Sequence, residues 1–288
     1  MQTTVALPRR RFVLGMIGSV LAGPALVRAG GALAAPAPRA AASLGPLINI
    51  PQTYNNCGPA AIAEVLNYWG VSRTQAQVQS VVRPDGGIIG MTPYGVRSYA
   101  STLGLRTLVG VGGSDALVKA MVASGLPIVV HQVVSAGDYT GHWRPIEAYD
   151  DAQSAFVCSD PLLGPGYQLA YDTFDRLWAQ RDYAFFVIYP PSRQAAVSAA
   201  VRAAGWNKVL AFEHDLALVK ANQLDVNPTA APAGLYSAYH YLALAWDEAQ
   251  LGRSAPARQY LQLAARAGAN AGEMRWVQAE ISLDVIES

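Results

Sequence analysis

Residues 52–59 are Gln52-Thr53-Tyr54-Asn55-Asn56-Cys57-Gly58-Pro59. They stand directly before a pattern in which Ile62, Leu66 and Trp69 recur at i, i+4 and i+7, the spacing of one helix face. The sequence therefore predicts that Cys57 lies where a loop enters a helix. A helix N-terminus carries a partial positive charge, which stabilises a thiolate and lowers the pKa of the thiol.

A thiolate nucleophile needs a base, and the base needs a group that orients its ring. His142 begins a predicted strand and Asp160 ends the next one, so a hairpin would bring the two side chains together. Gln52 lies five residues before Cys57, where its amide can point at a developing oxyanion. We therefore expect Cys57, His142 and Asp160 to be catalytic, with Gln52 in the oxyanion hole. The alternative for a lone cysteine at a helix start is a small buried hydrophobe.

The chain has two cysteines, which exclude a disulfide framework and a multi-cysteine zinc site. Cys158 lies on an apolar predicted strand and is expected in the core. A disulfide between Cys57 and Cys158 is the alternative in an exported protein, but it would consume the nucleophile. His214 and His240 have no metal-ligand spacing. The sequence implies no cofactor and no metal.

Between residues 47 and 190 the pattern changes from helices to strands. The expected helices are residues 92–103 and 114–123, the second capped by Ser114. The expected strands, in chain order, are residues 127–134, 146–149, 155–158 and 183–189. The second and third flank a turn, as in a hairpin. Helices followed by antiparallel strands predict an α+β fold.

From Gln194 to residue 288 the strand patterns disappear, and we expect about five helices after a boundary at Pro190-Pro191-Ser192. Six positions fit one tetratricopeptide unit, namely Tyr241, Leu244, Ala245, Ala257, Leu261 and Ala264. Glu248 and Ala269 depart from that pattern, and the alternative is an alanine-rich helical hairpin. If the helices are repeats, their concave face would bind a protein or peptide partner.

Residues 1–34 have the order of an export signal. Arg9-Arg10-Arg11 is followed by an apolar stretch, residues 12–27, and by the small-residue cleavage signal Ala32-Leu33-Ala34. The arginines before Phe12 resemble a twin-arginine signal. The alternative is a membrane anchor, but the stretch is shorter than the about 20 apolar residues of a span. We expect cleavage, a flexible lead-in over residues 35–46, no membrane span afterwards, and a periplasmic or extracellular protein.

Composition supports a globular chain. A prior of about 150 residues per domain gives about two domains for 288 residues. Hydrophobic residues make up 52% and charged residues 14%, which excludes a disordered chain. The formal charge is +1, and without the four arginines of residues 1–34 the remaining 17 basic and 20 acidic residues give −3. This balance gives no basis for nucleic-acid binding.

The run from Gln52 through Cys57-Gly58-Pro59 resembles the active-site segment of papain-like cysteine peptidases, in particular the family 39-like branch with its bacteriocin-processing, double-glycine-leader peptidases. Four further segments are similar to that family: 125–130, 141–143, 160–161 and 174–190. The resemblance covers about residues 47 to 190, and we take residues 47–191 as the papain-like domain. It implies a papain-like fold, a peptide or protein substrate, Cys57 as nucleophile, His142 as base, Asp160 as orienting residue and Gln52 as oxyanion donor.

The chain also departs from these relatives. Nothing in it resembles the transmembrane or ATPase domains of peptide-exporting transporters, and its active-site segment lacks the signature of papain and cathepsins. Three functions therefore remain open. The first is an exported cysteine peptidase with a thioester intermediate. The second is a catalytically silent module that binds peptides or proteins. The third is a transamidase or cell-wall amidase with the same triad.

Overall fold

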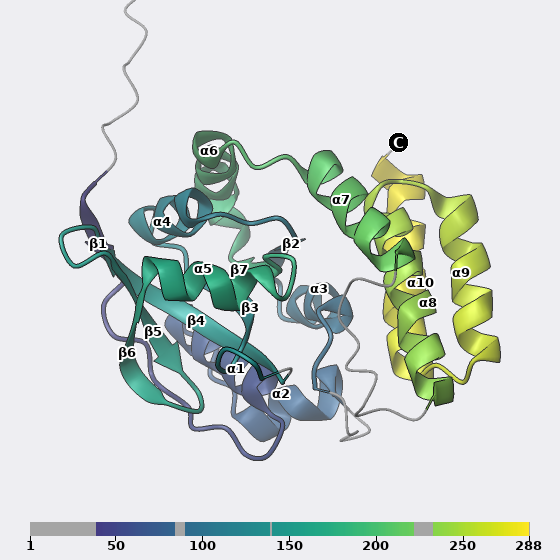
Figure 1. Cartoon of the computed structure of the whole chain (residues 1–288), viewed down its shortest axis with the longest axis horizontal. Coiled ribbons are helices and arrows are strands. Elements are labelled where there is room, and N and C mark those ends of the chain that lie inside the picture. Colours follow the sequence, from purple (N-terminus) through teal and green to yellow (C-terminus); the bar gives the residue numbers. More distant parts are fainter. Residues whose placement is uncertain (1–38, 84–89, 139, 222–232, 288) are drawn as a thin grey trace, which may run out of the picture. The chain divides into compact units, whose positions relative to one another are not determined.

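The computed structural model describes residues 39–83, 90–138, 140–221 and 233–287 (Figure 1). The strands are β1 (Ala41–Ser43), β2 (Arg106–Gly110), β3 (Ile128–Val133), β4 (Gly141–Asp150), β5 (Ala155–Asp160), β6 (Gly164–Ala170) and β7 (Phe185–Tyr189). They form one sheet of order β2-β7-β3-β4-β5-β6, and β1 pairs with β4. Every pair is antiparallel. The α+β class expected from the sequence is confirmed.

Ten α-helices and one short 3-10 helix lie in the described ranges. Before the last strand come α1 (Cys57–Tyr68), α2 (Gln75–Val82), α3 (Tyr94–Thr102), α4 (Asp115–Ala123) and α5 (Tyr171–Ala179). After it come η1 (Pro191–Arg193), α6 (Gln194–Ala204), α7 (Lys208–Lys220), α8 (Ala233–Gln250), α9 (Ser254–Arg266) and α10 (Ala271–Glu287). The five C-terminal helices agree in number with the sequence prediction.

A hydrophobic core lies on each face of the sheet. One joins α1, α2 and α3 to inward-facing strand residues such as Val129 and Phe186. The other joins α4, α5 and α6 to the opposite side, where Val130 and Phe156 are buried. Neighbouring strand residues 129 and 130 belong to different cores because successive side chains of a strand point to opposite faces. The sheet is thus covered on both faces, which fits its continuous apolar strands.

The hairpin that carries two of the predicted catalytic residues is confirmed. His142 is the second residue of β4, and Asp160 is the last residue of β5. The two strands pair antiparallel, with Ile146 opposite Cys158. The predicted helix around residues 115–123 is also confirmed, and the hydroxyl of Ser114 accepts a hydrogen bond from Leu117 N at 3.2 Å.

Part of the expected lead-in is ordered. Residues 41–43 form β1 and pair with residues 148–150 of β4, so the expectation of flexibility over residues 35–46 is wrong for this part. The alanines suit such an edge, because small side chains let a strand pack beside α4, which contacts β1. The predicted signal, residues 1–34, lies outside the described residues, so its cleavage stays a prediction.

The C-terminal helices pack against α3. The rings of Tyr94 and Trp246 lie 4.9 Å apart, and Arg97 Nη1 lies 3.1 Å from a carboxylate oxygen of Glu280. Helices α8 and α9 form a hairpin whose turn contains Gly252 at φ 74°. Whether they are tetratricopeptide units stays a prediction, as does the domain boundary near residues 191–194. Among the described residues, no helix combines the length and apolar character needed to cross a membrane.

Candidate active site

Cys57 is the first residue of α1, as the sequence predicts. The loop before it is held by Asn56, whose Oδ1 accepts from Arg83 Nη1 at 2.8 Å. The Asn56 amide nitrogen donates to Thr53 Oγ1 at 2.6 Å and to Gln79 Oε1 at 3.0 Å. Asn56 therefore ties the loop to α2 instead of capping α1 with its side chain. This fixes the backbone just before the sulfur.

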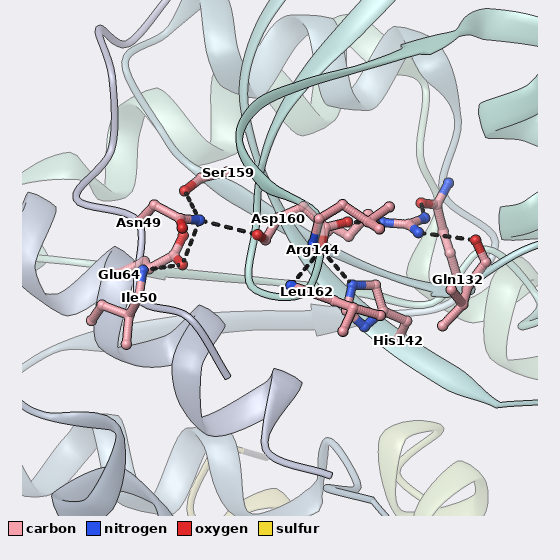
Figure 2. A network of polar contacts seen from close by, with 11 residues as sticks. Asn49, Ile50, Glu64, Gln132, His142, Arg144, Ser159, Asp160 and Leu162 are labelled. Atoms are coloured by element: carbon pink, nitrogen blue, oxygen red, sulfur yellow. Dashed lines mark hydrogen bonds and ion pairs between the residues drawn. The ribbon is translucent and has the colours of Figure 1, made fainter. Parts of the chain in front are cut away.

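His142 acts directly on Cys57, since its hydrogen bonding and its charge lower the pKa of the thiol. His142 Nε2 lies 2.9 Å from Asp160 Oδ1 (Figure 2), which leaves Nδ1 as the ring nitrogen for Cys57. All three side chains are nearly covered, with Cys57 6% exposed, His142 1% and Asp160 0%. The structure therefore brings the three predicted catalytic residues together in the order thiol, imidazole, carboxylate.

The environment favours an ionised pair. Burial alone raises the pKa of the Cys57 thiol, but the hydrogen bond and charge of His142 outweigh it, helped by the backbone N–H groups of Trp143 and Gly58, so the pKa is lowered. Burial alone lowers the pKa of His142, but its bonds to Asp160 and Cys57 raise it. A low thiol pKa beside a high imidazole pKa is the condition for a thiolate–imidazolium pair.

Asp160 stays ionised although it is fully buried. Burial on its own raises the pKa of this carboxyl, but the hydrogen bond and charge of His142 and the charge of Arg144 hold it well below its usual range. Its Oδ1 also accepts the backbone N–H of Leu162 at 2.7 Å and of Leu163 at 2.9 Å. A carboxylate with several donors is a fixed negative charge beside the imidazole.

Two site residues were missed by the sequence reasoning. Arg144 Nε donates to Asp160 Oδ2 at 2.5 Å, and Arg144 Nη1 donates to Gln132 Oε1 at 2.6 Å (Figure 2). The signal for Arg144 is its spacing, since residue i+2 of a strand shares the face of His142. The signal for Gln132 is weaker, because only the register of β3, which pairs Gln132 with His142, places it there.

Gln52 is anchored beside the end of β5. Its backbone N–H donates to Pro161 O at 2.8 Å, directly after Asp160 in the chain. Within the described part of the chain, its side-chain oxygen Oε1 is buried and has no hydrogen-bond partner. A buried amide atom without a partner is uncommon in a folded protein and needs an explanation. The position is compatible with a group that meets the substrate, and the oxyanion role stays a prediction.

A second polar network lies next to Asp160 (Figure 2). The amide nitrogen of Asn49 donates to Asp160 O and Ser159 Oγ, both at 3.1 Å, and to Glu64 Oε1 at 3.4 Å. Burial raises the pKa of Glu64 to about 8. Glu64 is therefore largely neutral at pH 7, and its protonated form adds no second negative charge beside the ionised Asp160.

Cys158 is buried in the core, as expected, and both cysteines are free. Burial raises the pKa of the Cys158 thiol to about 12. Over the described ranges, no group of three or more His, Cys, Asp or Glu side chains is arranged to hold a metal ion. Of the two cysteines, Cys57 is therefore the one whose surroundings favour a thiolate.

Apolar side chains are exposed next to these residues. Leu162 and Leu163, whose N–H groups bind Asp160, are 49% and 46% exposed, and Tyr54 is 89% exposed three residues before Cys57. Large exposed apolar groups in one place are typical of a binding surface. The backbone N–H of Gln52 donates to Pro161 O, so these exposed side chains lie on chain segments that meet beside Asp160.

Residues 45–184 match the Peptidase_C39 like family. One similar solved structure is a double glycine motif protease from an AMS/PCAT transporter in complex with the leader peptide, with 17% identity, a TM-score of 0.42, and coverage of 52% of this chain and 94% of that chain. Another is the peptidase domain of Streptococcus ComA, a bifunctional ABC transporter involved in a quorum-sensing pathway, with 20% identity, a TM-score of 0.40, and coverage of 49% and 96%. No curated protein matches. The family match spans Gln52, Cys57, His142 and Asp160.

Proposed function

We propose that the protein is a cysteine peptidase that hydrolyses peptide bonds, and the match of residues 45–184 to the Peptidase_C39 like family supports this proposal. The observation that carries the proposal is that Asp160 Oδ1 holds His142 Nε2 at 2.9 Å, while His142 lowers the pKa of the Cys57 thiol. A covered cysteine without such partners would have a raised pKa, as Cys158 has.

The reaction proceeds in two halves. The Cys57 thiolate attacks the carbonyl carbon, so a C–S bond forms and the carbonyl oxygen becomes an oxyanion. Gln52 and the Cys57 backbone N–H stabilise that oxyanion. The C–N bond then breaks, the leaving amine takes a proton from the His142 imidazolium, and a thioester remains. In the second half His142 removes a proton from water, the hydroxide attacks the thioester, and the acid leaves with Cys57 restored as thiolate.

The exposed apolar groups beside the triad support a peptide substrate. Tyr54 and Leu162 offer apolar contact area outside the covered sulfur, which suits side chains of an extended peptide. A transamidase or amidase with the same triad would pass through the same thioester and differ only in the acceptor of the acyl group. We infer hydrolysis of peptides because water is the acceptor that needs no second binding site.

Labelling of the full chain with an epoxide or iodoacetamide probe tests this proposal. We expect modification at Cys57 and none at Cys158, located by mass spectrometry of the peptides. Cys57→Ala should abolish labelling and hydrolysis of a peptide mixture with the fold intact, and Cys158→Ser should retain both. Equal modification of the two cysteines near pH 6 would contradict the proposal and favour the silent binding module.

We also propose that the protein works outside the cytoplasm after removal of residues up to about Ala34. Arg9-Arg10, Phe12 and the apolar run that follows support this. A twin-arginine route would let Cys57 reach its folded, covered position before it meets an oxidising compartment. N-terminal sequencing of the exported protein should begin near Ala35, and a sequence that begins at Met1 would contradict export by cleavage.

A further inference from the structure

Arg144 is a cation without solvent contact. Its side chain is 0% exposed, on β4 two residues after His142. All of its nitrogen atoms are used: Nε donates to Asp160 Oδ2 at 2.5 Å, Nη1 to Gln132 Oε1 at 2.6 Å, and Nη2 to Val134 O at 3.2 Å (Figure 2). A buried guanidinium is costly unless it is paired and hydrogen-bonded, and these three contacts define its position closely.

Gln132 holds the far side of the guanidinium. It is buried, and its register on β3 pairs it with His142. While its Oε1 accepts from Arg144, its Nε2 donates to Phe174 O of α5 at 2.8 Å. The amide therefore has both ends engaged, and its orientation is fixed by α5. A series of side chains runs from α5 through Gln132 and Arg144 to Asp160 and on to His142.

The two oxygens of Asp160 have different roles in this series. Oδ1 accepts from His142 Nε2 and from the N–H groups of Leu162 and Leu163. Within the described part of the chain, Oδ2 accepts its hydrogen bond from Arg144 Nε. Without Arg144, Oδ2 would be a buried anion oxygen without a donor, and the carboxylate would gain by turning. Arg144 thus decides which oxygen faces the imidazole.

We propose that Arg144, oriented by Gln132, is a positioning residue that fixes Asp160 so that its Oδ1 holds His142 in the ring orientation required for attack by Cys57. This inference rests on the proposed function and adds two residues to it. Arg144 acts through Asp160 and touches no substrate atom. The same network stabilises the sheet, so the test must separate a shift in the chemistry from a loss of folded protein.

The test is the pH dependence of alkylation of Cys57 by iodoacetate, which needs no substrate. The anionic reagent reacts fastest when Cys57 is a thiolate and His142 an imidazolium, so the rate is bell-shaped in pH. The upper limb reports loss of the imidazolium proton. Arg144→Met should move the upper limb to lower pH by about one unit, the size of one charge-assisted hydrogen bond to Asp160. Gln132→Met keeps that bond and frees only the orientation of the guanidinium, so it should move the upper limb in the same direction by less.

Two variants sharpen this expectation. Arg144→Lys keeps the charge but loses the donors that bridge to Gln132, so its upper limb should lie between wild type and Arg144→Met. Arg176→Met is the matched control, because Arg176 is 62% exposed and pairs with Asp172 on the outside of α5. Its limbs should equal those of wild type. If Arg144→Met does not fold, Gln132→Met carries the test alone, because it keeps the guanidinium.

A purely structural role would lower the melting temperature and the amplitude of labelling while both limbs stay in place, and this result in Arg144→Met and Gln132→Met would overturn the proposal. The proposed function fails separately, if wild-type Cys57 itself shows no bell-shaped profile. The two failures are thus distinguishable within one experiment.

Discussion

Two cysteines of the same chain have opposite acid–base behaviour because their neighbours differ. Cys57 and Cys158 are both buried, and burial raises the pKa of each thiol. Only Cys57 has the His142 ring and two backbone N–H groups aimed at its sulfur, and these reverse the sign of the shift. A cysteine is therefore assigned as a nucleophile by donors at the sulfur and not by exposure.

At the same scale, Gln52→Ala tests the oxyanion role. We expect a loss of roughly 10²–10³ in kcat, the usual cost of one oxyanion donor, with labelling of Cys57 unchanged because the donor acts only on the developing oxyanion. Hydrolysis of a peptide mixture and probe labelling measure the two effects. Gln153→Ala is the control, since Gln153 lies in the exposed turn between β4 and β5. If the rate of labelling fell as much as kcat, Gln52 would instead act by holding the loop that leads into Cys57.

At the scale of elements, the sequence predicts those helices and strands whose apolar residues form a clear pattern. The face of Ile62, Leu66 and Trp69 predicts α1, and the apolar runs around a turn predict the β4–β5 hairpin. The helix α2 was missed because only Val78 and Val82 of its eight residues are buried, which is too short a stripe to define a period. The edge strand β6 was missed because it opens on Gly164-Pro165-Gly166, a turn signal.

Some residues of the candidate site are likewise predictable from the sequence, and others are not. Cys57, His142 and Asp160 are predictable, since nucleophile, base and orienting residue have a known chemical order and each lies at the end of a predicted element. Arg144 and Gln132 are not, because a buried polar residue on a strand is recognised only from partners on other strands, and the sequence does not contain the register.

The missed helix α2 leads to a prediction about Asn56, whose side chain connects the loop to Gln79 and Arg83. Asn56→Ala should lower the free energy of unfolding by about 1–3 kcal/mol through loss of buried hydrogen bonds. It should also slow the labelling of Cys57 severalfold, because the loop before the sulfur is released. Denaturant unfolding and probe labelling measure both.

Asn67→Ala is the matched control on the same helix. The Asn67 amide donates to Ala63 O at 2.7 Å and to Arg73 O at 3.1 Å, at the end of α1 away from Cys57. It should destabilise the protein to a similar degree while labelling stays at the wild-type rate. Equal slowing in both variants would mean that general stability, and not the loop, controls the reactivity of the sulfur.

At the scale of the whole described molecule, the N-terminal and C-terminal helices share one hydrophobic core. Gly95 of α3 is placed so that a side chain there would meet the Trp276 ring of α10 at 3.0 Å, so the helices pack closely at that point. Thr92 Oγ1 donates to Glu273 Oε1 at 3.0 Å nearby. Met91 lies just before α3, and its carbonyl oxygen accepts a hydrogen bond from the indole N–H of Trp143, the residue after His142. Helix α3 thus links the C-terminal helices to the candidate active site.

Carboxyl groups are buried where these helices meet. Burial raises the pKa of Asp247 on α8, and the charges of Asp215, Asp182 and Glu248 raise it further. Burial likewise raises the pKa of Asp215 on α7, to about 7, and hydrogen bonding between the two carboxyls lowers the pKa of Asp215 while it raises that of Asp247. The folded state therefore keeps a proton on this pair at pH values where the unfolded chain has lost it.

Linkage gives the sign of the effect. A carboxyl with a raised pKa in the folded state contributes stability below its ordinary pKa of about 4, and this contribution is lost as pH rises through the raised value. Asp247→Asn removes that loss, because the amide is neutral at every pH and can still donate to Asp215. We therefore compare the melting temperature of Asp247→Asn with that of wild type at the same pH. The difference should be more favourable to the variant at about pH 8 than at about pH 5, by a few degrees.

Asp172→Asn, on the exposed side of α5, should show no such gain, because the pKa of Asp172 is lowered by its hydrogen bond with Arg176. A melting temperature that falls equally at both pH values in Asp247→Asn would mean that the pair is held by its geometry and not by a shared proton.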